Sequence, residues 1–89
     1  VLKYRVPRRA DEARDQPPGR ALMDAQRALR VVRGKARDWG LDPKRIGMLG
    51  FSAGGNLAAR AALMSDSPSY DALDDVDAQS CRPDFAVLI

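Results

Sequence analysis

Hydrophobic residues in the first half of the chain recur at the spacing of an α-helix. From about Gly19 to Asp38 they stand alternately three and four positions apart, which places them on one face of a helix. Gly40 then supplies the left-handed conformation that ends a helix, and Asp42-Pro43 is typical of a turn. The pattern predicts a helix over about 19–38 with this buried stripe: Leu22, Ala25, Leu29, Val32, Ala36 and Trp39.

Short apolar runs elsewhere in the chain predict strands. The run from Val1 to Val6 ends at Pro7, which cannot donate a hydrogen bond to a sheet. Ile46 to Phe51 is apolar and bounded by turn residues, as in a buried parallel strand. Asp84 to Ile89 predicts a third strand.

The remaining segments predict one more helix and two loops. Ala53 to Met64 is rich in Ala and Leu and has no internal proline, so we expect a second helix there. Residues 7–19 contain Pro17-Pro18-Gly19 and predict a loop, and residues 65–83 predict a long loop with room for one short helical turn. Strand, helix, strand, helix and strand in this order are typical of the α/β class with a parallel sheet.

Length and composition limit what the chain can be. Its 89 residues allow at most one small domain, and 45% hydrophobic with 30% charged residues exclude a disordered segment and a membrane span. The single cysteine, Cys81, excludes an internal disulfide and a multi-cysteine zinc site, and no histidine is present as base or metal ligand. The start at Val1 and the apolar end at Ile89 indicate that 1–89 is a central fragment of a single larger domain.

Charge is distributed unevenly along the chain. Residues up to Arg37 include 11 basic and 4 acidic residues, whereas those from Asp38 onward include 4 basic and 8 acidic residues. A basic half is compatible with nucleic-acid binding, but no aromatic residues are interleaved to stack on bases. We therefore expect no nucleic-acid partner and interpret five arginines as the solvated side of the amphipathic helix: Arg20, Arg27, Arg30, Arg33 and Arg37.

One motif between the central strand and the second helix carries chemistry. Gly50-Phe51-Ser52-Ala53-Gly54-Gly55 fits the pattern G-x-S-x-G. A nucleophile elbow requires a buried strand that turns at once into a helix, with the serine at the apex in a strained backbone conformation. The flanking Gly50 and Gly54 stand where we expect a Cβ to collide, and Gly55 adds a small residue at the helix start.

This setting predicts an acyl-transfer site. The Ser52 hydroxyl would attack an acyl carbon, and the Ala53 backbone N–H at the open helix end would stabilise the oxyanion. The competing interpretation is a helix N-cap serine in a phosphate-binding turn. Neither G-x-G-x-x-G nor the Gly-Lys-Ser/Thr of a phosphate loop is present, so the nucleophile is favoured.

Several segments resemble the middle of an α/β-hydrolase, in particular acetylxylan-esterase-like and lipase/esterase enzymes. The block from Asp42 to Ala58 is the most specific part of the resemblance. The resemblance implies a three-layer α/β/α fold, Ser52 as nucleophile, Ala53 as oxyanion donor and no cofactor or metal. The substrate it implies is a carboxylic ester, often an acetyl group on a sugar. The segments that carry it are Tyr4-Arg5-Val6-Pro7, Asp24-Ala25-Gln26-Arg27-Ala28, Asp42 to Gly47, Gly50 to Ala58 and Arg82-Pro83-Asp84-Phe85.

The same resemblance implies that parts of the site lie outside this chain. Such enzymes take a second oxyanion donor from a His-Gly-Gly loop, and the triad Asp and His from later strands. Their sheet also has a strand between those at Val1 to Val6 and Ile46 to Gly50, so an empty slot is expected here. We therefore expect the isolated chain to be poorly folded or self-associated and inactive. Two alternatives stay open: a serine peptidase of the same fold, and a non-catalytic interaction fragment.

The acidic residues are assigned structural roles. Four lie close together but do not fit an EF-hand loop, because no glycine stands among them: Asp71, Asp74, Asp75 and Asp77. Turn and cap roles are expected for them instead of calcium binding. Asp24 is expected to pair with Arg27 or Arg20, or to hold a nearby loop.

Three other side chains are of interest for the site. Asn56 stands within the first turn after the nucleophile, where it can touch substrate or satisfy backbone groups. Trp39 completes the apolar stripe and is expected in the core rather than as a platform for a sugar. Cys81 is expected to be a buried or loop thiol without chemistry.

Overall fold

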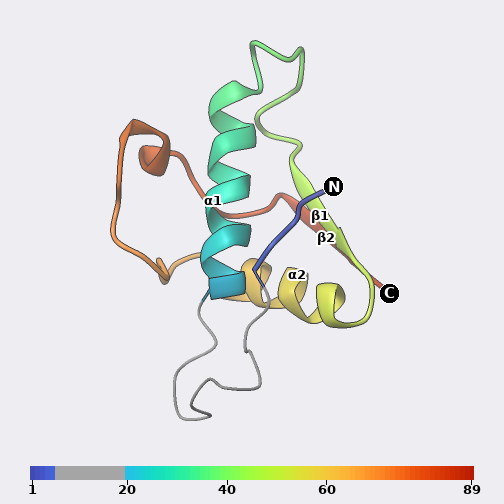
Figure 1. The fold of residues 1–89 in the computed structure, drawn as a ribbon. Coiled ribbons are helices and arrows are strands. Elements are labelled where there is room, and N and C mark those ends of the chain that lie inside the picture. Colours follow the sequence, from blue (N-terminus) through green and yellow to red (C-terminus); the bar gives the residue numbers. More distant parts are fainter. Residues whose placement is uncertain (6–19) are drawn as a thin grey trace.

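The computed structural model describes residues 1–5 and 20–89, and within them a small α/β unit. Strands β1 and β2 are parallel neighbours, with Gly47 beside Phe85 and Gly50 beside Leu88. The α/β class and the parallel pairing are thereby confirmed. The elements in chain order are α1 (Arg20–Lys35), β1 (Gly47–Gly50), α2 (Ala53–Leu63), the 3₁₀ helix η1 (Asp75–Ala78) and β2 (Phe85–Leu88) (Figure 1).

The end of α1 is closed by the glycine that the sequence indicates. Gly40 has φ 70°, a left-handed conformation. The Leu41 N–H donates to the Ala36 carbonyl at 2.7 Å, and the Gly40 N–H donates to the Arg37 carbonyl at 3.2 Å. This pair of bonds satisfies carbonyls that a helix end would otherwise leave free. The left-handed turn predicted at Gly40 is confirmed, but the helix ends at Lys35 and not at about Asp38 as predicted.

Trp39 does not complete the buried stripe, and this prediction is wrong. Its side chain is 57% exposed. At Ala36 the backbone bond tightens, because its N–H donates to the carbonyl of Arg33 instead of the residue four positions back. α1 therefore ends at Lys35, and Trp39 lies beyond it in the turn before Gly40.

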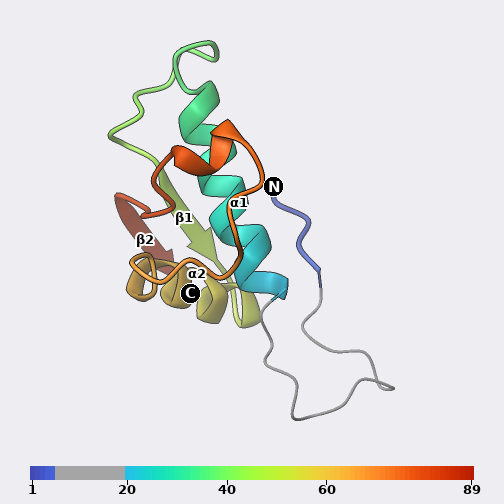
Figure 2. The same cartoon turned by 90° about the vertical axis from the view of Figure 1, so that its left-hand side faces the viewer.

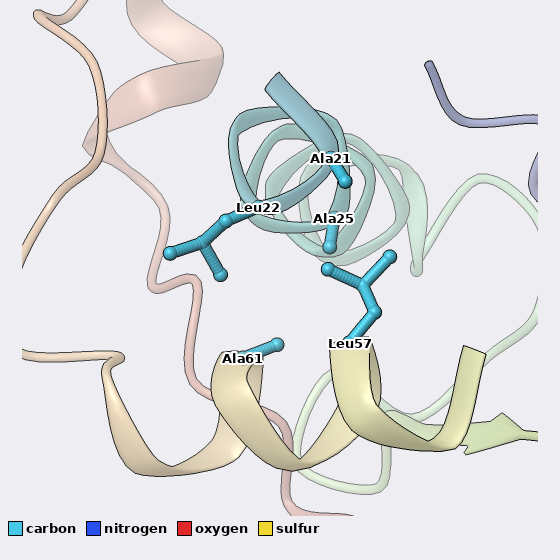
Figure 3. Packing of buried hydrophobic residues seen from close by; sticks show 5 residues of the cluster. All are labelled: Ala21, Leu22, Ala25, Leu57 and Ala61. Carbon is cyan, nitrogen blue, oxygen red and sulfur yellow. The ribbon is translucent and has the colours of Figure 1, made fainter. Parts of the chain in front are cut away.

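The core lies where α1 crosses α2 (Figure 3). Ala21 and Ala25 of α1 face Leu57 and Ala61 of α2, and the small alanines let the two helices come close. A second cluster joins the far part of α1 to the start of β1. Met48 packs against both clusters, so its side chain joins β1 to the core. The second cluster consists of Leu29, Ala36 and Ile46.

Gln26 is a fully buried polar residue that ties α2 to α1. Its amide nitrogen donates to the carbonyls of Met64 and Ser67, at 3.4 and 3.2 Å. Its oxygen accepts from the N–H and the hydroxyl of Ser69, each at 2.8 Å. One side chain thus satisfies backbone groups just after α2, which would be costly to leave unpaired.

Arg27 on α1 binds the acidic segment that the sequence placed in a loop. Its guanidinium makes a two-pronged bond to Asp74, at 2.7 and 2.9 Å, and a third bond to Asp77 at 2.8 Å. The Asp77 side chain is inaccessible to solvent and also accepts from the Tyr70 hydroxyl and the Leu73 N–H. Asp74 caps η1 by accepting from the Val76 N–H. The expected turn and cap roles of these two carboxylates are confirmed.

Two further arginines on the same side of α1 continue this contact. Arg30 donates to the Gln79 carbonyl at 3.1 Å, and its guanidinium lies 5.2 Å from the centre of the Tyr70 ring. Arg33 donates to the carbonyl of Ser80 at 2.6 Å, and it also reaches two groups nearer the strands. Figure 2 shows η1 lying against α1. We call Arg27, Arg30 and Arg33 the arginine row.

The arginine row is bonded within the molecule. The prediction of a solvated helix side is wrong for Arg30 and Arg33, whereas the Arg27 side chain is 33% exposed. The side chains of Arg30 and Arg33 are only about a tenth exposed. The basic front half and the acidic back half of the chain are complementary, so the charges meet within the molecule. Arg37, in contrast, is exposed as expected.

Residues 1–5 do not form the strand expected over Val1 to Val6. A strand needs a hydrogen-bonded neighbour, and none of the described residues pairs with them. Instead Tyr4 packs against the helix core, and Arg5 binds Asp24 through its backbone N–H at 2.8 Å and its guanidinium at 3.0 Å. Asp24 thus holds a neighbouring segment, which was one of the roles expected of it.

An apolar groove of about 360 Å³ separates the first residues from β1. Val1 and Leu2 line one part of it, and Met48 and Leu49 of β1 line another, with α1 also contributing.

The other segments follow the sequence closely. The long loop after α2 contains a single short helical turn, η1, among its described residues. The loop predicted for 7–19 lies outside the described residues. Over the described ranges no helix has the length and apolar character needed to cross a membrane. In the same ranges no cluster of side chains is suited to hold a metal ion.

Asp77 makes the stability of this fold depend on pH. Burial alone would raise the pKa of its carboxyl, but hydrogen bonds from Tyr70, Leu73 and Arg27 outweigh burial and lower the pKa to about 2. A carboxyl with a lowered folded-state pKa stabilises the fold above its unfolded pKa, about 3.9, and loses that effect as the pH falls towards 2. Asp77→Asn should therefore lower Tm near neutral pH, and its difference from wild type should shrink between about pH 4 and 2.

Thermal unfolding of the natural chain that contains residues 1–89, followed by circular dichroism, measures this difference. Asp75→Asn is the matched control, because Asp75 is an exposed residue of the same 3₁₀ helix. A Tm difference for Asp77→Asn that is constant from neutral to acidic pH would contradict the prediction.

Candidate functional site

Ser52 lies at the sharp turn between β1 and α2. Its backbone has φ 54° and ψ −116°, and it alone among the described non-glycine residues has a positive φ. Such a conformation costs on the order of 1–3 kcal/mol and persists only where neighbours enforce it. Ser52 occupies the N-cap position of α2, yet its side chain makes no capping hydrogen bond. Ser52 therefore stands at the N-cap position without using its side chain as a cap, and the residue is exposed to solvent.

Backbone hydrogen bonds hold this turn from both sides. The Ser52 N–H donates to the Ile89 carbonyl at 2.9 Å, and the Ile89 N–H donates to the Gly50 carbonyl at 3.0 Å. On the helix side, the Asn56 N–H donates to the Ser52 carbonyl at 3.1 Å. The strained residue is thus fixed between the end of β2 and the first turn of α2.

The glycines around Ser52 have unequal roles. A Cβ on Gly50 would overlap the carbonyl group of Gly54, and one on Gly55 would lie 3.1 Å from the carbonyl oxygen of Gly50. A Cβ on Gly54 would meet nothing closer than the Tyr4 hydroxyl at 3.8 Å. The expected collision is therefore confirmed at Gly50 but is wrong for Gly54. Gly54 is already in the helix, and its backbone carbonyl is the group that leaves no room at Gly50.

The start of α2 offers a backbone donor beside Ser52. Ala53 is the first residue of the helix and is exposed, and none of the described residues accepts its N–H. The amino end of a helix carries partial positive charge and favours an anion. Asn56 is exposed too, and its side chain makes no bond within the described part of the chain. The geometry therefore places Ser52, Ala53 and Asn56 together at one solvent-facing corner.

Among the described residues, no base lies beside the hydroxyl of Ser52. The sequence contains no histidine, and no described side chain bonds to the Ser52 hydroxyl. The ion pairs described above lie elsewhere, along α1 and at its first turn, and a further pair, Arg45 with Asp42, lies in the turn before β1. Cys81 is buried, as expected, and its thiol donates to the Ser65 carbonyl at 3.3 Å.

Two residues that the sequence did not single out support the serine. Ile89 bonds the Ser52 N–H, and Asp84 bonds the residue before β1: its carboxylate accepts from the Ile46 N–H at 2.8 Å. The bond from Ile46, and then the nearby Arg33 guanidinium, lower the pKa of Asp84. The sequence signal for Asp84 is a carboxylate directly before an apolar strand, where a backbone N–H of the neighbouring strand needs an acceptor.

The fold and this corner match a known family. Residues 4–88 match the BD-FAE family, which is nearly the whole chain. The chain belongs to the BD-FAE family, a group of α/β-hydrolases. An acetylxylan esterase of Xylanibacter ruminicola is 33% identical over 88 residues, which are 99% of this chain but 14% of that protein. The chain is thus related to carbohydrate esterases.

A solved structure gives the same result for the fold of this BD-FAE chain. The acetyl ester-xyloside bifunctional hydrolase of Caldicellulosiruptor lactoaceticus is 42% identical and superposes with a TM-score of 0.74. The match covers 96% of this chain and 29% of that one. The BD-FAE chain therefore spans well under a third of the length of either relative, and it has the fold of one part of such a hydrolase.

Gly50 and Gly54 of this BD-FAE chain differ in the space around them, so substitution by alanine should have opposite effects on stability at the two positions. Gly50→Ala should destabilise the chain by about 3 kcal/mol or more, because its Cβ meets backbone that cannot move aside. Gly54→Ala should be neutral or stabilise by up to about 1 kcal/mol, because alanine favours the helix and has room. Urea unfolding of the natural chain that contains these residues measures both. Equal losses at the two positions would refute this account of the turn.

Proposed function

We propose that this chain carries the nucleophile of a serine carboxylic ester hydrolase and that Ser52 is that nucleophile. The observation that carries the proposal is the Ser52 backbone, strained at φ 54° while the side chain stays free of any capping bond. A serine that acted only as a helix cap would accept, through its hydroxyl oxygen, a hydrogen bond from the first backbone N–H groups of the helix. A strained serine with a free, exposed hydroxyl is instead what a nucleophile at a strand-to-helix turn requires.

The chemistry is a two-step acyl transfer. The Ser52 oxygen forms a bond to the acyl carbon, the alcohol leaves with a proton, and water then releases the acid and restores the hydroxyl. The Ala53 N–H donates to the oxyanion, and the amino end of α2 adds its partial positive charge. The base that takes the proton from Ser52, its acidic partner and the second oxyanion donor belong to sequence beyond residues 1–89.

For the substrate class we propose acetyl esters of carbohydrates. The relatives support this choice, because one is an acetylxylan esterase and another is an acetyl ester-xyloside hydrolase. Asn56 stands beside Ser52 with a free amide and is the candidate contact to a polar substrate group. No cofactor and no metal are needed for this reaction.

Labelling of the natural chain that contains residues 1–89 tests the nucleophile. A fluorophosphonate probe should label the wild type, and Ser52→Ala should abolish labelling and lower kcat on acetyl esters by roughly a million-fold. Ser67→Ala is the matched control, since Ser67 is an exposed serine in the loop after α2. Circular dichroism checks that each variant is folded.

The outcome also separates the alternatives. Labelling of Ser52 with turnover of acetylated xylo-oligosaccharides but not of peptide substrates supports the proposal. Turnover of peptides alone would show a serine peptidase instead. A folded wild type that the probe does not label would show a non-catalytic protein.

Expressed alone, residues 1–89 should self-associate and show no esterase activity. The groove beside β1 and the exposed apolar side chains of Leu49, Phe51 and Phe85 leave hydrophobic surface and a strand edge uncovered. Sedimentation velocity measures the association, and Leu49→Lys should reduce it by placing a charge on that surface. A monomer with cooperative unfolding and ester turnover would overturn this prediction.

A further inference from the structure

The strain at Ser52 must be maintained by contacts outside the elbow itself. Ser52 has one backbone donor, and it is bonded to the Ile89 carbonyl, directly after β2. The Ile89 N–H in turn donates to the Gly50 carbonyl, so Ile89 is hydrogen-bonded to the residues on both sides of Phe51. The Ser52 backbone therefore depends on Ile89 reaching this one position along β1.

Ile89 reaches that position only if β2 pairs with β1 in a single register. Side-chain burial usually sets register, because a slip of one residue turns a hydrophobic face outward. Here all four residues of β2 are exposed among the described residues, and β1 has glycine at both ends. Within residues 1–89, burial of side chains therefore specifies the register of this pair of short strands only weakly.

Asp84 supplies a register contact at the opposite end of the strands. Its backbone N–H donates to the Ile46 carbonyl at 2.6 Å, and its carboxylate accepts from the Ile46 N–H at 2.8 Å. Both polar backbone groups of Ile46 are thereby bonded by one residue. The preceding Pro83 cannot donate a hydrogen bond, so Asp84 is the first residue able to start the ladder.

Arg33 of α1 fixes Asp84 in place. It donates to the Asp84 carboxylate at 3.1 Å, to the Pro43 carbonyl at 3.1 Å and to the Ser80 carbonyl at 2.6 Å. One guanidinium thus joins the segment before β1, the segment before β2 and the helix that carries the core. A shift of β2 along β1 would break the bonds from Arg33 to Asp84 and Ser80, while the bond to Pro43 keeps Arg33 beside the segment before β1.

We propose that Asp84, anchored by Arg33, is a positioning residue for the Ser52 nucleophile. It sets the register in which β2 runs along β1, and Ile89 at the far end of β2 then holds the strained Ser52 backbone. Asp84 touches no substrate and acts through the strand pair. The expected change in the labelling rate rests on the proposed function of Ser52, whereas the role of Asp84 in strand register does not.

One other contact competes for this role. The ring of Phe85 lies against Gly47 and leaves no room for a side chain there. That contact also resists a slip of the strands, but it lies on an exposed surface and Phe85 itself is 56% exposed. Phe85→Ala therefore serves as the rival variant in the test.

The test compares Asp84→Ala with Asp74→Ala in the natural chain that contains residues 1–89. Both carboxylates pair with an arginine of α1 and both accept a backbone N–H, but only Asp84 contacts the residue before β1. The first readout is the rate constant for phosphonate labelling of Ser52, measured well below Tm so that all variants are folded. Asp84→Ala should lower it by about tenfold or more, because small displacements of a nucleophile cost large factors in rate, whereas Asp74→Ala should stay within about twofold.

The conservative variant separates positioning from loss of charge. Asp84→Asn keeps a carbonyl oxygen that can accept from the Ile46 N–H, so it should label within about threefold of wild type. The second readout does not need activity: hydrogen exchange of the peptide over Gly50 to Ala53 should be at least about tenfold faster in Asp84→Ala, with Leu57 to Ala61 unchanged. If Asp84→Ala does not fold, Arg33→Met carries both readouts, with a smaller loss of about threefold expected.

These results distinguish the two proposals. A wild type that is not labelled defeats the function assigned to Ser52, while hydrogen exchange still decides the role of Asp84. Unchanged labelling and unchanged exchange in folded Asp84→Ala overturn the positioning role. An equal loss in Asp74→Ala, or a loss in Phe85→Ala alone, overturns it as well.

Discussion

The arginine row of α1 is the interaction on which the rest of the structure depends. A long connection with few apolar residues leads from α2 to β2, and it could not be held by hydrophobic packing alone. Arg27 and Arg30 bind it through Asp77 and the Tyr70 ring, and Arg33 binds the segment that enters β2. Each guanidinium reaches several acceptors in a planar arrangement, so each can join separate segments.

The arginine row and the apolar core have different roles in the fold. The core between α1 and α2 sets how the helices cross, and Met48 attaches β1 to it. The arginine row then places the returning chain, so that β2 lies beside β1. Ser52 stands at the junction of the two systems: α2 holds its carbonyl side and Ile89 holds its N–H. A strained serine of this kind needs both, because neither the helix nor the strand alone would fix its φ and ψ.

Much of this arrangement was predictable from the sequence, and the exceptions have two causes. The turn at Gly40 and the strand-to-helix turn at Ser52 are local patterns, and the structure has them where the sequence places them. The arginine row was predicted wrongly because it depends on which distant segment lies nearby, and local spacing carries no information on that. Trp39 and Gly54 were predicted wrongly because they depend on where a helix ends or begins, which local patterns place least accurately. The charge contrast between the two halves was the one available signal for the arginine row.

The amino-acid sequence by itself determined the α/β class, the order of the elements and the serine at the turn, because periodicity, glycine and proline act over a few residues. The tertiary structure alone decided what holds that serine. Ile89 and Asp84 reach Ser52 and Ile46 across more than thirty residues of chain, and only the folded path brings them there. The same path decided that residues 1–5 lie against the helices, because a strand forms only where a hydrogen-bonding neighbour is in place.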